Sequence, residues 1–321
     1  MAPTPFAVSA PSGGSIQPMS ALKLTNASGQ RRAAIPIEQL DDLWFMWSRC
    51  NLTCTHCYVG SNPHNDTLQM ITLEEARPVL REAVELGVSR IYFTGGEPFI
   101  HPEIMPLIQE AAEVAPVTVL TNATKPIEKH IEALLPLKAR LTLRISLDDH
   151  VEERHDAIRG AGTYARTVRN TRHLAELGFR VIVTVTPVVF EGTSLCREDV
   201  EAEFAEMFTG DVSVKIIAHT LGMGAEVERS GRTDPDFFLA EAHLRDVDPG
   251  WFQCHNGRAV QKIDGELRVY PCPIIYDDVR FDLGGSLRES LQPVHLAHPA
   301  CYAFCYRGRG SCTDDARADG I

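Results

Sequence analysis

The residues Cys50-Asn-Leu-Thr-Cys54-Thr-His-Cys57 directly follow the apolar run Leu-Trp-Phe-Met-Trp-Ser-Arg at residues 43–49, and this stretch decides the fold. The apolar run predicts a buried β-strand. Spacings of four and three residues allow one tight loop to aim three thiolates at a single centre. Iron–sulfur clusters prefer soft thiolate ligands and normally have four of them. Three cysteines therefore leave one iron free for a small-molecule ligand.

A zinc site is the alternative for the same cysteines. Structural zinc ligands usually come as two spaced pairs, whereas this loop has no second pair close to it in the sequence. His56 could act as a fourth ligand, but it lies between two cysteines, so we expect its side chain to point away. The motif therefore favours an iron–sulfur cluster.

Apolar runs alternate with amphipathic stretches from residue 43 to residue 218. Because parallel strands need crossover helices, this alternation predicts an α/β fold with a parallel sheet. Six strand–helix units are fewer than the eight of a closed barrel. The predicted strands are 43–49, 90–94, 117–121, 141–147, 181–189 and 212–218, and the predicted helices are 73–85, 102–114, 127–137, 163–177 and 197–208.

Three regions are expected along the chain. Residues 1–40, which begin with an Ala-, Pro-, Ser- and Gly-rich stretch, predict a flexible N-terminal arm without the basic and apolar regions of a signal peptide. Residues 41–235 hold the strand–helix units. Residues 236–321 predict a smaller second domain, because the pattern changes there to short segments with five cysteines.

Composition narrows the classes of function. The formal net charge of −12 gives no electrostatic support for a nucleic acid partner. No apolar run reaches the length of a membrane-spanning helix, so we expect no membrane partner and a cytoplasmic protein. In that compartment nine cysteines do not predict a disulfide framework, and their clustering points to metal.

A second motif, Gly95-Gly96-Glu97-Pro98, follows the second predicted strand. With the cysteine loop, it makes residues 43–219 resemble the radical S-adenosylmethionine (SAM) superfamily, whose core is a partial (β/α)6 TIM-like barrel. The resemblance implies that the three cysteines hold a [4Fe–4S] cluster and that SAM chelates its open iron. Glycines would let the backbone approach the amino group of SAM without a Cβ in the way. A plain turn is the alternative for this motif taken alone.

The resemblance implies further SAM contacts. Ser146 and Asp148 end the fourth strand, where the family places ribose or carboxylate contacts, and Arg159 resembles the family arginine that pairs with the SAM carboxylate. Ordinary roles in turns or sheets are the alternative for each. The other candidates are Asn122, Thr184 and Thr186.

The C-terminal cysteines resemble those of SPASM and twitch domains, which bind auxiliary [4Fe–4S] clusters. Cys254 and Cys272 stand at the base of a predicted hairpin that turns at Asp264-Gly265. A full SPASM domain has seven cysteines, whereas this region has five, which implies one auxiliary cluster. A structural zinc is the alternative. The cysteine that is left over is one of Cys301, Cys305 and Cys312.

The resemblance implies an enzyme that cleaves SAM to a 5′-deoxyadenosyl radical, with a reductant such as flavodoxin or ferredoxin. We expect hydrogen abstraction from a small polar metabolite, of sugar or aminocyclitol type, followed by oxidation or epimerisation. Cys196 is a candidate hydrogen donor, or a small buried side chain. The alternatives are a maturase of ribosomal peptides, for whose leader-binding domain the segment before residue 43 is too short, and a non-enzymatic iron–sulfur sensor or scaffold.

Overall fold

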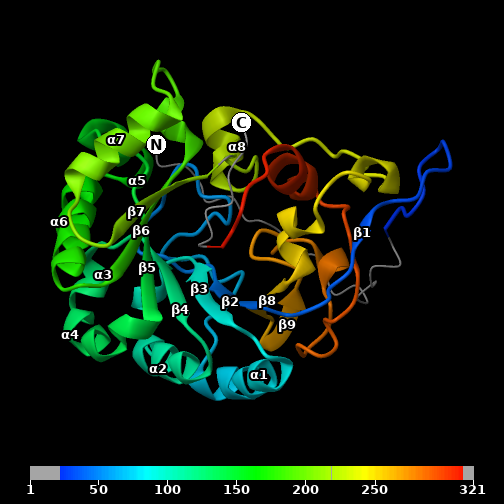
Figure 1. Ribbon diagram of the computed structural model, residues 1–321, viewed down its shortest axis with the longest axis horizontal. Coiled ribbons are helices and arrows are strands. Elements are labelled where there is room, and N and C mark those ends of the chain that lie inside the picture. Colours follow the sequence, from blue (N-terminus) through cyan, green and yellow to red (C-terminus); the bar gives the residue numbers. More distant parts are fainter. Residues whose placement is uncertain (1–21, 218, 314–321) are drawn as a thin grey trace, which may run out of the picture.

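The computed structural model describes residues 22–217 and 219–313, and an eight-stranded sheet forms its centre (Figure 1). The strand order is β7-β6-β5-β4-β3-β2-β8-β9; neighbours from β7 to β8 are parallel, and β9 is antiparallel to β8. The strands are β2 (Asp42–Trp47), β3 (Arg90–Gly95), β4 (Val117–Thr121), β5 (Leu141–Ser146), β6 (Arg180–Val185), β7 (Val212–Ile216), β8 (Gly257–Ile263) and β9 (Glu266–Tyr270).

Helices surround the outer side of β2–β7, as Figure 1 shows for α1, α2, α4, α6 and α7. This arrangement confirms the partial (β/α)6 barrel. No helix in the described part of the chain is long and apolar enough to cross a membrane. The helices are α1 (Leu73–Leu86), α2 (Ile104–Val114), α3 (Lys125–Glu128), α4 (Ile131–Leu134), α5 (Glu152–Arg159), α6 (Thr163–Glu176), α7 (Arg197–Met207) and α8 (Ala225–Ser230).

Local sequence signals set the helix ends. Helix α1 begins with a capping box, in which the Thr72 hydroxyl accepts from the Glu75 backbone N–H and the Glu75 carboxylate accepts from the Thr72 backbone N–H. It ends at Gly87, whose φ of 74° a residue with a Cβ adopts only with strain. Such ends fix where each crossover returns to the sheet.

One predicted strand ends early and one predicted helix is divided, and prolines explain both. The strand predicted over 181–189 ends at Val185, because Pro187 has no N–H for the ladder and starts a 3₁₀ turn instead. The helix predicted over 127–137 is divided into α3, α4 and a 3₁₀ turn, Leu135–Arg140. Pro136 lies at the start of that turn, where its missing N–H costs nothing.

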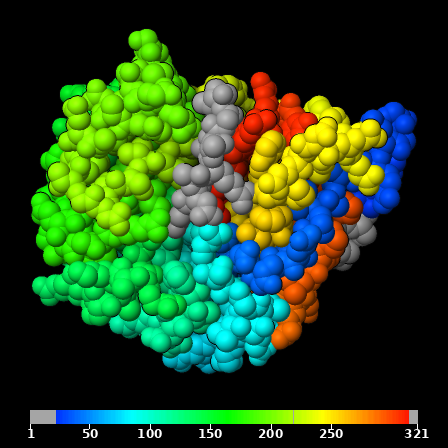
Figure 2. Space-filling view, in the orientation of Figure 1, coloured from blue at the N-terminus to red at the C-terminus, as the bar shows by residue number. Residues whose placement is uncertain are grey.

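The flexible arm expected over residues 1–40 is wrong for its described part. Ala33, Ile35 and Leu40 are buried, and β1 (Ala34–Ile35) pairs antiparallel with β10 (Val294–His295). Burial of these apolar side chains stabilises the fold, because it removes apolar surface from water. In Figure 2 the blue residues of this segment lie against the yellow and orange C-terminal part. Residues 1–21 lie outside the described residues.

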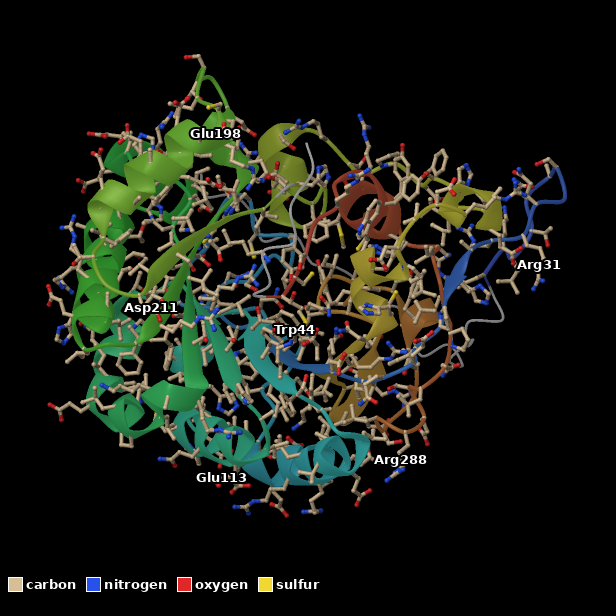
Figure 3. All side chains as sticks on the ribbon, in the orientation of Figure 1. Arg31, Trp44, Glu113, Glu198, Asp211 and Arg288 are labelled. Carbon is tan, nitrogen blue, oxygen red and sulfur yellow. The ribbon has the colours of Figure 1, made fainter. Side chains whose placement is uncertain are left out.

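The predicted hairpin is present and joins the barrel. β8 and β9 meet at Asp264 and Gly265, both with positive φ, as a tight hairpin turn requires. β8 also pairs in parallel with β2, so the barrel sheet continues into the C-terminal part. Trp44 of β2 stacks on Tyr92 of β3 with ring centroids 3.9 Å apart, and Figure 3 places Trp44 near the middle of the molecule.

Candidate active site

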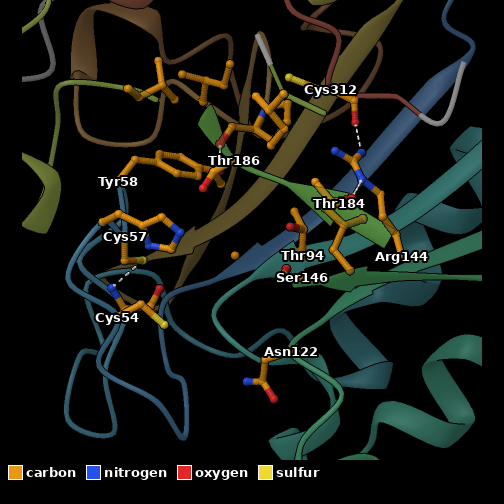
Figure 4. A pocket seen from close by; sticks show the side chains of 18 of the residues that line it. Cys54, Cys57, Tyr58, Thr94, Asn122, Arg144, Ser146, Thr184, Thr186 and Cys312 are labelled. Carbon is orange, nitrogen blue, oxygen red and sulfur yellow. Dashed lines mark hydrogen bonds between the residues drawn. The ribbon is translucent and has the colours of Figure 1, made fainter. Parts of the chain in front are cut away.

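A cavity of about 230 Å³ opens at the carboxyl ends of the parallel strands (Figure 4). This end of a barrel is where active sites of such folds lie. The cavity collects most of the side chains that the sequence singled out. From that set, its lining includes Cys50, Cys54, Cys57, Gly95, Gly96, Glu97, Asn122, Ser146, Arg159, Thr184, Thr186 and Cys312.

Each sulfur of the cysteine loop accepts a hydrogen bond. The backbone N–H of Leu52 donates to Cys50 Sγ at 3.4 Å, and that of Ser61 donates to Cys57 Sγ at 3.3 Å. The Arg159 Nη1 donates to Cys54 Sγ at 3.9 Å. Hydrogen bonds to the sulfurs of iron–sulfur ligands set the potential of the cluster. The loop is therefore built to present thiolates.

Burial disfavours the charged, thiolate form of these cysteines unless a cation lies beside them. It raises the pKa of Cys54 to about 11, and it raises the pKa of Cys50 further. Within residues 22–217 and 219–313, no three Cys, His, Asp or Glu side chains are close enough to hold one metal ion. In a four-iron cluster each cysteine binds a different iron, so the sulfurs stand farther apart. The donor set fits the cluster better than a zinc ion.

Backbone approach explains the two glycines. A Cβ on Gly95 would lie 2.1 Å from Trp47 O, and a Cβ on Gly96 would lie 1.9 Å from Arg49 O. The Gly96 N–H donates to Trp47 O at 2.6 Å. The glycine pair thus packs directly on the end of β2, beside the cysteine loop. Here the glycines are needed for chain packing, whatever they also contribute to a ligand.

The Glu97 side chain links the end of β3 to the end of β4 through hydrogen bonds. Its carboxylate accepts from the Phe99 and Asn122 backbone N–H groups and from the Thr121 hydroxyl, at 2.8 to 3.0 Å. Burial raises the pKa of Glu97 to about 7, although these donors oppose the rise. Pro98 is buried at the start of a 3₁₀ turn and does not line the cavity. Glu97 therefore links the ends of two strands beside the cavity, whereas Pro98 lies outside the lining.

Asp148 lies behind the lining and is paired within the protein. Arg159 Nε donates to Asp148 Oδ2 at 2.5 Å, and Thr186 Oγ1 donates to Oδ1 at 3.0 Å. His56 Nε2 lies 3.1 Å from Oδ2. Burial favours the neutral acid, but Arg159 and His56 outweigh it and hold the pKa of Asp148 well below its usual range. Asp148 therefore positions Arg159 and His56 at the cavity.

The expectation that His56 points away is wrong. Its side chain lines the same cavity as the three cysteines, although only 7% of it is exposed. Its Nδ1 has no hydrogen-bond partner among the described residues. A buried polar atom without a partner costs free energy. His56 therefore has one buried ring nitrogen without a protein partner among the described residues, in a side chain that lines the cavity.

Cys196 does not belong to the site. It is exposed at the N-cap of α7, and its backbone N–H donates to the Asp199 carboxylate at 2.9 Å. Figure 3 places Glu198, two residues later, at the rim of the molecule. Loop 191–195 carries this cysteine away from the barrel mouth. Cys196 is therefore not the buried side chain that the sequence offered as the alternative, and it does not line the cavity where a hydrogen donor would act.

Four of the five C-terminal cysteines surround a second, small cavity. Cys254, Cys272, Cys301 and Cys305 line it, and all four are buried. Cys301 and Cys305 come from one π-helix, Cys301–Arg307, which sets the spacing of their side chains. Cys312 instead lines the first cavity. By this lining Cys312 is the candidate for the left-over cysteine, which the sequence could not identify, although its charge contributes, after burial, to the raised pKa of Cys305.

Several residues of the lining were missed from the sequence. Arg144 of β5 is buried, and its Nε donates to Thr184 Oγ1 at 2.9 Å. Tyr58 joins the cysteine loop to the C-terminal part, because its hydroxyl donates to Pro273 O at 3.1 Å. For Arg144, the available signal was an arginine within an apolar strand. The role of Tyr58 depends on a contact between distant segments, which no local pattern reveals.

Comparison with known proteins gives consistent matches. Residues 44–203 match the model of the radical SAM superfamily. The antilisterial bacteriocin subtilosin biosynthesis protein AlbA of Bacillus subtilis is 32% identical over 51% of this chain and 36% of its own length. The mycofactocin maturase MftC of Mycobacterium ulcerans is 28% identical over 77% of this chain and 71% of its own. This chain thus spans about a third of AlbA.

Solved structures share the fold. The structure of anSMEcpe with bound AdoMet superposes with a TM-score of 0.56 at 16% identity, over 83% of this chain and 85% of that one. Streptococcus suis SuiB bound to S-adenosylmethionine gives 0.52 at 14% identity, over 73% and 60%. Because the family match contains the whole cysteine loop and the glycine pair that packs beside it, the chain belongs to the radical SAM superfamily, whose enzymes use a [4Fe–4S] cluster and SAM.

Proposed function

We propose that the protein is a radical SAM maturase of a peptide. The observation that carries the proposal is the similarity to MftC over 77% of this chain, because the family match itself covers only residues 44–203. The likeness therefore extends beyond the SAM-cleaving domain. AlbA, by its name, takes part in making a bacteriocin. These relatives favour the alternative, a peptide substrate, over the expected sugar or aminocyclitol.

The shape of the site supports a long substrate. The central cavity and a second hollow of about 650 Å³ share His219 and Thr220 in their linings. The second hollow is bordered by α8 residues such as Glu226 and Arg229. A small metabolite would occupy only the central cavity. A peptide would extend from the cysteine loop into the second hollow.

The chain's own groups have separate tasks in this proposal. Cys50, Cys54 and Cys57 would hold the cluster, which supplies the electron that cleaves SAM. The backbone at Gly95 and Gly96 and the guanidinium of Arg159 would bind the amino and carboxylate groups of SAM. Apolar lining residues such as Trp44 and Phe304 exclude water from the reacting atoms. A flavodoxin or ferredoxin would deliver the electron.

The second set of cysteines would hold one auxiliary [4Fe–4S] cluster. Burial raises the pKa of Cys301 to about 12 and the pKa of Cys254 well above its usual value, so these thiols also need a cation to ionise. Pro273 and Ile274, which follow Cys272, line the SAM cavity. The auxiliary cluster would therefore lie close enough to the substrate to accept an electron after hydrogen abstraction. This favours net oxidation over epimerisation.

The test uses the full chain, reconstituted and reduced without oxygen. With SAM and short peptides encoded near its gene, the true substrate should increase release of 5′-deoxyadenosine. The triple variant of Cys50, Cys54 and Cys57 to Ala should release none, whereas the exposed-site control Cys196→Ala should act as wild type. Deuterium transfer from a labelled sugar or aminocyclitol, with no response to any peptide, would overturn the peptide proposal. No SAM cleavage at all would indicate a sensor.

Product analysis separates the two reactions. Oxidation removes two hydrogens from the peptide and introduces no deuterium from D2O. Epimerisation leaves the mass unchanged in H2O and introduces one solvent deuterium in D2O. Cys312 is then the candidate donor, because it lines the cavity whereas Cys196 does not. Cys312→Ala should stop epimerisation but leave oxidation in place.

A further inference from the structure

Two buried cations inside the barrel hold a piece of the chain's own backbone. Arg144 of β5 donates through Nη1 to the carbonyl oxygen of Cys312, and Lys215 of β7 donates through Nζ to the carbonyl oxygen of Thr313. Both side chains are at least nine-tenths buried. In Figure 4, Arg144 reaches toward Cys312 on the side of the cavity opposite Cys54 and Cys57. Segment 311–313 is thus bound by its main chain.

The sheet places these cations in register. β5, β6 and β7 are consecutive neighbours, and Lys215 is the partner of Thr184 across β6 and β7. The Thr184 hydroxyl accepts from Arg144 Nε at 2.9 Å, which fixes the direction of the guanidinium. Two rigid strands therefore present two donors to two successive carbonyl oxygens. Because both acceptors are main-chain carbonyl oxygens, such an arrangement recognises a backbone whatever its side chains are, here one that bends at Cys312 and Thr313.

We propose that Arg144 and Lys215 form a subsite for the backbone carbonyls of the peptide substrate, and that segment 311–313 occupies this subsite in the substrate's place. Ser311 and Cys312 line the same cavity as the cluster cysteines, so the segment lies where a peptide would meet SAM. The inference rests on the proposed function in one respect, which is that the competing ligand is a peptide.

The proposal has an energetic consequence. A ligand segment within the same chain has a high effective concentration, so a substrate must displace its two carbonyl oxygens from Arg144 and Lys215 before it binds. Charged donors make stronger hydrogen bonds to carbonyl oxygens than neutral ones do. The segment therefore stays in the subsite while no substrate is present. The cost of displacement selects for peptides that make further contacts elsewhere.

The experiment follows hydrogen exchange of residues 308–313 in the full chain by mass spectrometry. The probe is the blocked peptide acetyl-Gly-Arg-Gly-Ser-Ser-Thr-amide, which copies the segment with serine in place of cysteine. In wild type, millimolar probe should raise the exchange rate in a saturable manner. In Arg144→Met and Lys215→Met, exchange without probe should be about tenfold faster and should not respond to the probe.

Two sets of variants make the result interpretable. Arg144→Lys and Lys215→Arg keep the charge and should restore slow exchange, which a variant that merely unfolds would not allow. Arg169→Met removes an exposed cation of α6 that pairs with Glu128, and it should behave as wild type. Unchanged exchange in the double variant Arg144→Met/Lys215→Met would overturn the proposal. A wild type that ignores the probe at every concentration would also overturn it.

The same measurement separates this proposal from the proposed function. If the probe displaces the segment but no encoded peptide increases 5′-deoxyadenosine release, the carbonyl subsite stands and the maturase assignment fails. If a precursor peptide is processed while Arg144→Met and Lys215→Met leave its Kd unchanged, the maturase assignment stands and the subsite is wrong.

Discussion

Arg159 holds Asp148 through both carboxylate oxygens, with Nε 2.5 Å from Oδ2 and Nη2 3.3 Å from Oδ1, while its Nη1 reaches Cys54 Sγ. One guanidinium thus joins a buried carboxylate to a cysteine of the cluster loop. Only 1% of the Asp148 side chain and 11% of the Arg159 side chain are exposed. Because water hardly reaches this pair, removing one charge would leave the other buried without a partner.

We predict that Arg159→Met lowers the free energy of unfolding by about 3 kcal/mol, because it leaves Asp148 as a buried carboxylate with weaker partners. Urea unfolding of the metal-free chain measures the loss. The double variant Asp148→Asn/Arg159→Met should recover part of it, since both charges are gone. Arg77→Met, which breaks the exposed pair with Glu110, should cost far less, because solvent screens that pair. Equal losses in Arg159→Met and Arg77→Met would refute the prediction.

The second prediction concerns the iron content. Wild type reconstituted without oxygen should hold about eight irons, in two four-iron clusters. The quadruple variant of Cys254, Cys272, Cys301 and Cys305 to Ala should hold about four, because these cysteines surround the second cavity. Cys312→Ala should keep all eight. Iron near four in wild type, with zinc bound, would mean that the second set is a zinc site.

The third prediction tests the glycine pair. Gly96→Ala should lower stability by about 3 kcal/mol or more, since its Cβ would lie 1.9 Å from Arg49 O, a backbone atom that cannot turn aside. Gly285→Ala is the matched control, because the atom nearest to its added Cβ would be Leu267 O at 3.8 Å. Thermal unfolding of the metal-free chains compares them. A Gly96→Ala chain as stable as wild type would show that the two loops are less tightly packed than described.

The fourth prediction concerns pH. Burial and the nearby Arg159 lower the pKa of His155 to about 4. Between that value and the usual 6.5 the unfolded chain binds a proton that the folded chain refuses, so stability falls as the pH falls. At pH 5 the loss is about 2 kcal/mol relative to pH 7.5. His155→Asn should remove that part of the pH dependence.

Urea midpoints at pH 7.5 and pH 5 provide the measurement. The exposed His64 offers a control, and His64→Asn should keep the wild-type pH dependence. Identical pH dependence in wild type and in His155→Asn would show that His155 does not remain neutral in the folded chain.

Much of the barrel could be predicted because its strands are short apolar runs separated by periodic helices. Phe93 and Val119 lie in such runs and are fully buried. Helix α5 was missed, because it buries only His155 and Ile158 and so has a weak apolar period. The link of β8 to β2 was missed because pairing between distant strands leaves no local signal.

The site residues also divide into those that the sequence could predict and those that it could not. Cys50, Cys54 and Cys57 were found because ligand spacing within one loop is itself local. Cys196 was misplaced, since a position after a strand does not fix where a loop carries the side chain. Which four of the C-terminal cysteines form the auxiliary set could not be predicted, for a related reason. Cys301 and Cys312 differ in which cavity they face, and that depends on the path of the chain between them.

The parallel pairing of β2 with β8 has a consequence for synthesis of the chain. Asp42 lies opposite Gly257, so β2 must wait for residues made much later. At ribosomal rates of about 5–20 residues per second, that wait lasts roughly 10 to 40 s. Throughout it, the apolar strand Asp42–Trp47 presents one unpaired edge, which is a template for aggregation. Expression at low temperature with abundant chaperones should therefore increase the yield of folded protein more than any change to the barrel surface.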